Sequence, residues 1–186
     1  ALRERIASFV PAHPIAGAEG SGVHHADAGL YNGRQVILTP LPQTAPQLLQ
    51  KATEVWTAIG AQVLRMTPDN HDSAFAAVSH LPHLLAFAYF AGVLGQPAGR
   101  ELLSLAGPGF RDFTRIAAGD PAVWRDILYS NREEVLKQTQ RLRRAIDAFE
   151  HVMKSGNLDA LEDLIRNASQ ARTTWQMSAK PGGTQR

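Results

Sequence analysis

The sequence predicts an α/β segment followed by an all-α segment, so that helix dominates overall. Residues 35–66 read as strand, helix and strand, whereas apolar residues from 67 onward recur with the 3.6-residue period of a helix. The chain has 186 residues, 44% of them hydrophobic and 19% charged, which is enough apolar material for a packed core. We predict an α/β domain over residues 1–66, a helical domain over 67–178 and a disordered tail over 179–186.

Composition and charge exclude several classes of protein. Lys and Arg number 19 against 17 Asp and Glu, and a net charge of +2 is not typical of a dedicated nucleic-acid binder. The absence of cysteine excludes disulfide scaffolds and thiol chemistry. No uninterrupted apolar run approaches the roughly 20 residues of a membrane span, and the charged N-terminus is not followed by the apolar stretch of a signal peptide. We therefore expect a cytoplasmic protein without a membrane partner.

The α/β segment is expected to contain short strands at residues 8–10, 35–38 and 61–66, and a helix over 44–60. Thr44 could cap that helix, with Pro46 in its first turn. A strand–helix–strand unit is the building block of a parallel sheet, and one such unit is too small for a whole domain. Because the chain also lacks an initiator methionine, we expect more of the sheet to lie upstream.

The helical segment is expected to contain helices over 67–94, 97–105, 120–156 and 158–175. The third would exceed 30 residues and carries an apolar stripe from Val123 to Met153. Such a stripe is too long for a small domain to cover, which favours a symmetric helical dimer. The alternative is that the stripe packs on other helices of its own chain.

Two groups of polar residues lie where a site could form. His13 follows the first strand at a place where α/β folds bind ligands, although a single loop histidine is often only solvated. Asp72, Ser79 and His83 fall within roughly 40° of one another around the 67–94 helix, and Pro82 should kink that helix. The stripe is interpreted as the wall of a site, or alternatively as buried polar groups that satisfy one another.

A third group, Arg111, Asp112 and Arg115, lies in a glycine-led turn. An arginine fork suits a small substrate with a carboxylate, whereas the alternative is a salt bridge between Asp112 and one of the arginines. Both can hold at once. Two histidine pairs lack a strong third ligand: His80 with His83, and His24 with His25. No metal site is expected.

Three motifs, in order along the chain, resemble the prephenate/arogenate dehydrogenase family of tyrosine biosynthesis. They are His-Pro-Ile-Ala-Gly-Ala-Glu (13–19), Ser-His-Leu-Pro-His (79–83) and Gly-Phe-Arg-Asp-Phe-Thr-Arg-Ile-Ala (109–117), the last followed by Asp120-Pro121 and Trp124. The resemblance covers about residues 10–172. It implies a Rossmann-like nucleotide-binding domain, a helical dimerisation domain and an active site between them. This chain then resembles the second half of the first domain, a remnant, joined to the whole of the second.

The resemblance also implies roles for individual residues. His13 matches the catalytic histidine, which takes the proton of the substrate's ring hydroxyl as hydride leaves for the nicotinamide. Arg115 matches the arginine that binds the ring carboxylate. Five further positions match residues that line the pocket or its entrance: Ser79, His83, Asp112, Trp124 and Glu19.

The implied function is NAD(P)-dependent oxidative decarboxylation of prephenate to 4-hydroxyphenylpyruvate. The alternatives are an arogenate-specific dehydrogenase, or a non-catalytic dimerisation or tyrosine-sensing module. Retention of His13 together with Arg115 favours the enzyme. NAD or NADP is the expected cofactor, a second copy of the chain the expected partner through the C-terminal helices, and tyrosine a candidate feedback inhibitor.

Two departures from the family pattern bear on these expectations. Ile15 stands where many members have methionine, a conservative apolar change. More seriously, the sequence has neither a Gly-x-Gly-x-x-Gly loop nor the catalytic serine that the family places upstream of the His-Pro motif. Cofactor-binding residues therefore stay unassigned, and we expect the chain by itself to be inactive.

Overall fold

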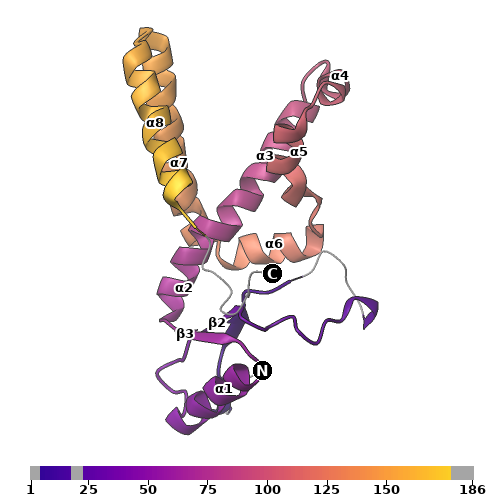
Figure 1. Cartoon of the computed structure of the whole chain (residues 1–186), viewed down its shortest axis with the longest axis vertical. Coiled ribbons are helices and arrows are strands. Elements are labelled where there is room, and N and C mark those ends of the chain that lie inside the picture. The colour runs from indigo at the N-terminus through magenta and orange to yellow at the C-terminus, as the bar shows by residue number, and fades with distance from the viewer. Residues whose placement is uncertain (1–4, 18–22, 177–186) are drawn as a thin grey trace, which may run out of the picture. The chain divides into compact units, whose positions relative to one another are not determined.

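The computed structural model describes residues 5–17 and 23–176, which form two compact units (Figure 1). One contains the described residues up to His71 together with residues 172–176, and the other spans Asp72–Ala171. The first holds a small sheet with one helix, and the second is helical. The predicted fold class, an α/β segment followed by an all-α segment, is confirmed.

The sheet of the first unit has three strands in the order β1-β2-β3: Ala12–Pro14, Gln35–Leu38 and Gln62–Arg65. Strand β2 pairs with β3 in parallel and with β1 in antiparallel orientation, which sets His13 opposite Ile37. Helix α1, Pro46–Ala58, connects the two parallel strands. The predicted strand–helix–strand unit is therefore confirmed.

The first predicted strand, over residues 8–10, is wrong. Ser8 ends a 3₁₀-helix, Ile6–Ser8, whose last turn is closed by the main-chain N–H of Phe9, and the first strand begins only at Ala12. Thr44 is not the cap of α1 either, because its hydroxyl donates to the Phe9 carbonyl at 3.0 Å and accepts from the Leu41 N–H at 3.0 Å. The N-cap of α1 is Ala45, whose methyl side chain cannot accept from the first turn.

The core of the first unit forms where β2 meets α1. Val36 and Leu38 are completely buried, and Tyr31 packs edge-on against Trp56 with ring centroids 5.2 Å apart. Gly60 turns the chain from α1 into β3 with φ at +88°, where a β-carbon would lie 2.9 Å from an oxygen of Asn32. Strand β2, which pairs with β1 and so positions His13, is therefore held in place by this small apolar core.

The predicted helix over residues 67–94 is confirmed in extent. It comprises helix α2 (Pro68–Phe75), a π-helical turn (Ala76–His80) and helix α3 (Leu81–Leu94). The π-turn lies just before Pro82, which has no N–H to donate to the preceding turn. The Leu81 N–H bonds the Ala76 carbonyl five residues back, so the extra residue is absorbed within the helix.

Two short helices follow, α4 (Gly99–Ser104) and α5 (Pro108–Thr114). The first agrees with the helix predicted over 97–105. The second replaces the predicted glycine-led turn, because its aromatic side chains pack on α3: Phe110 lies 5.5 Å from Tyr89 and 5.9 Å from Phe90 between ring centroids. Tertiary contacts, rather than local propensity, account for this helix.

The single helix predicted over 120–156 is wrong, since it is two helices, α6 (Pro121–Ser130) and α7 (Arg132–Ser155). They meet at Asn131, whose amide Nδ2 donates to the Asp72 carbonyl at 2.8 Å and lies 3.1 Å from Nδ1 of His80. Through these contacts, Asn131 links the start of α7 to α2 and to the π-helical turn.

Helix α7 ends at Gly156, which has φ at +67°, and α8 (Leu158–Thr174) follows, as predicted. Figure 1 shows α3 and α7 diverging from the level of the π-turn, with α4 and α5 beside the far part of α3. Along α7 only Val135 and Gln138 are buried, and no described residue of α8 is. Large apolar side chains are exposed on both helices: Leu136, Ile146, Met153, Leu158 and Ile165.

One described helix, Pro68–Leu94, is long and apolar enough to cross a membrane by length and composition alone. The expectation that no apolar run approaches the length of a membrane span is therefore wrong. Polar residues interrupt the apolar run in this helix, but its mean hydropathy stays high enough for a membrane span. Only 11% of the apolar window is buried inside the chain. Core helices of soluble proteins pass the same test, but such helices are normally covered.

Candidate functional site

His13 makes a close contact with a second histidine that the sequence reasoning missed. Its Nδ1 lies 2.8 Å from Nε2 of His71, and the two rings meet edge to face with centroids 5.1 Å apart. Both side chains are half-buried. Because the partners are 58 residues apart in the sequence, no local pattern could have indicated the pair.

Each histidine of this pair lies in a regular secondary-structure element. His13 is the middle residue of β1, held by its antiparallel register with Ile37. His71 lies in the first turns of α2, which begins directly after β3. There the Thr67 hydroxyl accepts from the Asn70 N–H at 3.2 Å, and the Thr67 carbonyl accepts from the His71 N–H at 3.0 Å.

The pKa of His13 is lowered from its ordinary value, first by burial and second by the neighbouring His71. Burial disfavours the charged imidazolium, and a second imidazole offers no negative charge to compensate. Both effects favour the neutral form of His13, which is the form that can accept a proton.

A second cluster forms on the helical unit around His83. Its ring stacks on Trp124 with centroids 3.5 Å apart and planes 20° from parallel. Its Nδ1 lies 2.9 Å from the Ser79 carbonyl, which can only accept, so Nδ1 carries the proton. The Nε2 of a neutral His83 is then an acceptor. Phe87, one turn further along α3, meets Trp124 edge-on at 6.3 Å.

The position of Trp124 depends on the start of α6. The Asp120 carboxylate caps that helix by accepting from the Ala122 and Val123 N–H groups, both at 2.9 Å. Gly119 precedes the cap, and a β-carbon there would meet the Trp124 ring at 2.5 Å. A glycine beside the indole is thus required for the stack with His83.

The predicted arginine cluster is partly assembled. Nε of Arg111 lies 3.1 Å from the Asp112 carboxylate, and both side chains are largely exposed. The alternative of an ion pair at Asp112 therefore holds, with Arg111 as the partner. Arg115 lies one turn further, where α5 passes into a short 3₁₀-helix, Arg115–Ala118, and its side chain is exposed.

The predicted site residues fall in different units. His13 belongs to the first, whereas Ser79, His83, Asp112, Arg115 and Trp124 belong to the second. The structure brings His83 together with Trp124 and with the backbone of Ser79, and pairs Asp112 with Arg111 rather than Arg115. Glu19 lies outside the described residues.

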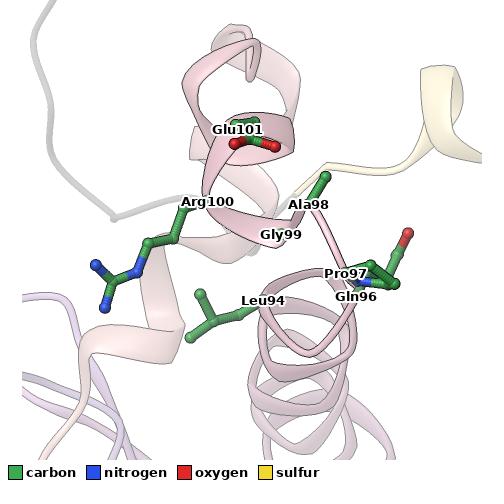
Figure 2. A pocket seen from close by; sticks show the side chains of 7 residues that line it. All are labelled: Leu94, Gln96, Pro97, Ala98, Gly99, Arg100 and Glu101. Atoms are coloured by element: carbon green, nitrogen blue, oxygen red, sulfur yellow. The ribbon is translucent and has the colours of Figure 1, made fainter.

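A pocket at the turn between α3 and α4 contains none of these residues. Figure 2 shows the seven residues that line it, all of which lie between Leu94 and Glu101 in the sequence. It carries one arginine and one glutamate but no histidine. Within residues 5–17 and 23–176, no group of three or more His, Asp or Glu is placed to hold a metal ion.

Two family profiles match successive parts of this chain. The nucleotide-binding domain of prephenate dehydrogenase matches residues 1–65, and the dimerization domain of prephenate dehydrogenase matches residues 67–167. The first profile covers β1, β2, α1 and β3, and the second begins just before α2. Every motif described above lies within one of the two.

Individual proteins give the same result. The cyclohexadienyl dehydrogenase of Zymomonas mobilis is 30% identical over 88% of this chain and 57% of its own length. The prephenate dehydrogenase of Bacillus subtilis is 32% identical over 88% of this chain and 44% of its own. The chain thus spans about half the length of these curated relatives.

Among solved structures, the prephenate dehydrogenase of Aquifex aeolicus in complex with hydroxyphenyl propionate and NAD⁺ superimposes with a TM-score of 0.83. It is 37% identical and covers 89% of this chain, which in turn covers 58% of that structure. Sequence profiles, relatives and fold therefore agree, and the chain belongs to the prephenate dehydrogenase family.

Proposed function

We propose that the whole protein carrying this chain is an NAD(P)-dependent prephenate dehydrogenase, and that this chain supplies the base and the carboxylate-binding group. The observation that carries the proposal is His13, whose Nδ1 contacts His71 and whose burial favours the neutral imidazole. Family membership alone does not require a poised base. Arg115, on the helical unit, supplies a cation for an acidic substrate.

The proposed chemistry begins at the ring carbon of prephenate that bears the hydroxyl. His13 accepts the hydroxyl proton as the C–H bond breaks and hydride leaves, so that a carbonyl forms at that carbon. The ring carboxylate then departs as carbon dioxide, its electrons make the ring aromatic, and the resulting phenolate takes the proton back. Nicotinamide is the hydride acceptor that this chemistry needs.

Within residues 5–17 and 23–176 we identify no residues that would hold the pyrophosphate of NAD. The connection from β2 to α1, residues 39–45, has two prolines and no glycine, and the side chain of Ala45 makes no cap at the start of α1. This differs from the glycine-rich turn that lets a pyrophosphate approach a helix N-terminus. We therefore assign no dinucleotide contact to these residues.

Arg115 is proposed to bind the ring carboxylate before it departs, because a guanidinium recognises a carboxylate through two parallel hydrogen bonds. Asp112 already forms an ion pair with Arg111, and we propose that this pair supports the end of α5, which Arg115 follows. His83, held flat against Trp124, is proposed to line the pocket with Ser79, and Glu19 to stand near its entrance.

We further propose a cytoplasmic homodimer formed through the helical unit. The matching profile is described as a dimerization domain, and the apolar side chains of α7 and α8 are exposed within one copy. A second copy is the partner that would cover them.

The decisive experiment is NADH or NADPH formation by the whole protein with prephenate and, separately, with arogenate. We expect turnover with prephenate. Turnover with arogenate alone would assign the arogenate-specific alternative. No turnover with either substrate, in protein with a native circular dichroism spectrum, would favour the non-catalytic module, and adding tyrosine to the same assay tests feedback inhibition.

A further inference from the structure

We propose that His71 is a positioning residue that holds His13 in the tautomer with its proton on Nδ1, leaving Nε2 to accept the substrate proton. The role concerns the base of the proposed reaction and so rests on the proposed function. It is carried by the 2.8 Å contact between Nδ1 of His13 and Nε2 of His71.

The contact has two possible arrangements when both rings are neutral. Either His13 donates from Nδ1 and His71 accepts at Nε2, or His71 donates from Nε2 and His13 accepts at Nδ1. In the second arrangement the only proton of His13 is on Nε2, so that nitrogen cannot take another. Because Nδ1 is occupied by the contact in either case, only the first arrangement leaves His13 able to act as a base.

The first arrangement also suits the protonated state. When His13 accepts a proton at Nε2, its Nδ1–H continues to donate to His71 without any rearrangement, and the hydrogen bond becomes charge-assisted. A carboxylate in the place of His71 would stabilise the imidazolium more strongly and would raise the pKa of His13. His71 supplies no such negative charge, and burial is the first cause of the lowered pKa of His13.

The backbone supports the geometry from both sides. β1 fixes His13 through its pairing with β2, and His71 sits where α2 is anchored by Thr67. An orienting group is useful only if its own ring is held, and both rings here come from regular elements, the middle of β1 and the first turns of α2, rather than from long loops.

The test compares wild-type whole protein with His71→Leu and His71→Gln. Leucine removes the acceptor, whereas the glutamine side-chain oxygen can take the place of Nε2. Long-range ¹H–¹⁵N spectra of histidine-labelled protein report the tautomer directly, and the His13 signals are assigned by their loss in His13→Asn. We expect the Nδ1–H form of His13 in wild type and in His71→Gln, and the Nε2–H form to become populated in His71→Leu.

Turnover should follow the tautomer. We expect kcat to fall at least about tenfold in His71→Leu with little change in KM, and to be largely restored in His71→Gln. An Nε2–H tautomer in wild-type protein would overturn the proposal whether or not His71→Leu folds, and so would an unchanged tautomer and kcat in a folded His71→Leu. If wild type fails to turn over prephenate, the proposed function fails, and the spectra still decide the role of His71.

Discussion

His13 and Arg115 present opposite electrostatic situations within one chain. His13 is half-buried beside another histidine, so its environment favours the uncharged form. Arg115 is exposed, and its guanidinium group carries a positive charge. A neutral imidazole can accept a proton and a guanidinium can bind a carboxylate, which are the two roles proposed for these residues.

The first prediction concerns the pH dependence of catalysis. Since the base must be neutral, activity should rise with pH through the pKa of His13. Because burial and then His71 lower that pKa, the acidic limb should lie below the ordinary histidine value of about 6.5. In the whole protein, His13→Asn should reduce kcat by about 10²–10⁴-fold with a smaller effect on KM. A pH–rate profile of the two proteins checks this, and survival of the acidic limb in the variant would exclude His13 as the base.

The second prediction uses the two arginines of α5 and the following turn as a matched pair. Arg115→Ala should raise the KM for prephenate at least about tenfold, because a charged partner for the carboxylate is lost. Arg111→Ala, which breaks only an exposed ion pair with Asp112, should change KM little. Steady-state kinetics of both variants decide the assignment. The reverse ranking would show that Arg111 holds the carboxylate.

Among the elements, strands and helices with a strong local pattern were predictable from the sequence. The apolar run of β2 and the periodicity of α1, α3 and α8 are properties of neighbouring residues. The break at Asn131 is different, because it depends on a hydrogen bond to the carbonyl of Asp72, 59 residues away. Helix α5 likewise depends on aromatic contacts with α3. Local reasoning cannot anticipate such tertiary effects.

The candidate site shows the same division. Motifs close in sequence singled out His13, His83 and Arg115. His71 was missed although it is next to Asp72, which the helical stripe did include, because its partner lies on a different element. The stack of His83 on Trp124 joins α3 with α6 and had no signal in helical spacing either. Only the fold shows which ring faces which.

The third prediction concerns the start of α6. Asp120→Ala removes the side chain that accepts from two N–H groups, and such caps contribute about 0.5–2 kcal/mol to stability. Urea unfolding of the whole protein should show a loss in that range. Asp126→Ala is the control: this aspartate pairs with the exposed Arg125 of the same helix, and its replacement should change stability by less than about 0.5 kcal/mol. Equal losses would mean that the cap does not stabilise the helix.

At the scale of the whole molecule, the helical unit buries little of its own apolar surface. Its buried hydrophobic side chains among the described residues are small: Ala76, Ala86 and Val135. Ile146 and Met153, by contrast, are 46% and 57% exposed on α7. Soluble monomers rarely leave long apolar stripes in water, and such stripes mark interaction surfaces. For the apolar α2–α3 helix, a membrane is an alternative to a partner chain as the environment that covers it. A measurement of oligomeric state therefore tests the dimer and the membrane alternative together.

The fourth prediction is that the protein is a dimer whose contact includes the apolar stripe of α7. Ile146→Glu combined with Met153→Glu places two charges on that stripe and should shift the protein to monomer at tens of micromolar in sedimentation velocity. The control is Ala148→Glu, which adds the same kind of charge about 200° around the helix from Ile146. It should leave the dimer intact.

The outcomes separate the possible ways in which the stripe could be covered. Because Ile146 and Met153 are exposed in a single copy, the double variant should keep its helical circular dichroism signal while losing the partner. A monomeric wild-type protein would refute the dimer. A wild-type protein that needs detergent to stay dispersed would instead point to a membrane around the α2–α3 helix. A double variant that stays dimeric would move the contact from α7 to another helix, with α8 and its exposed Leu158 and Ile165 the next surface to change.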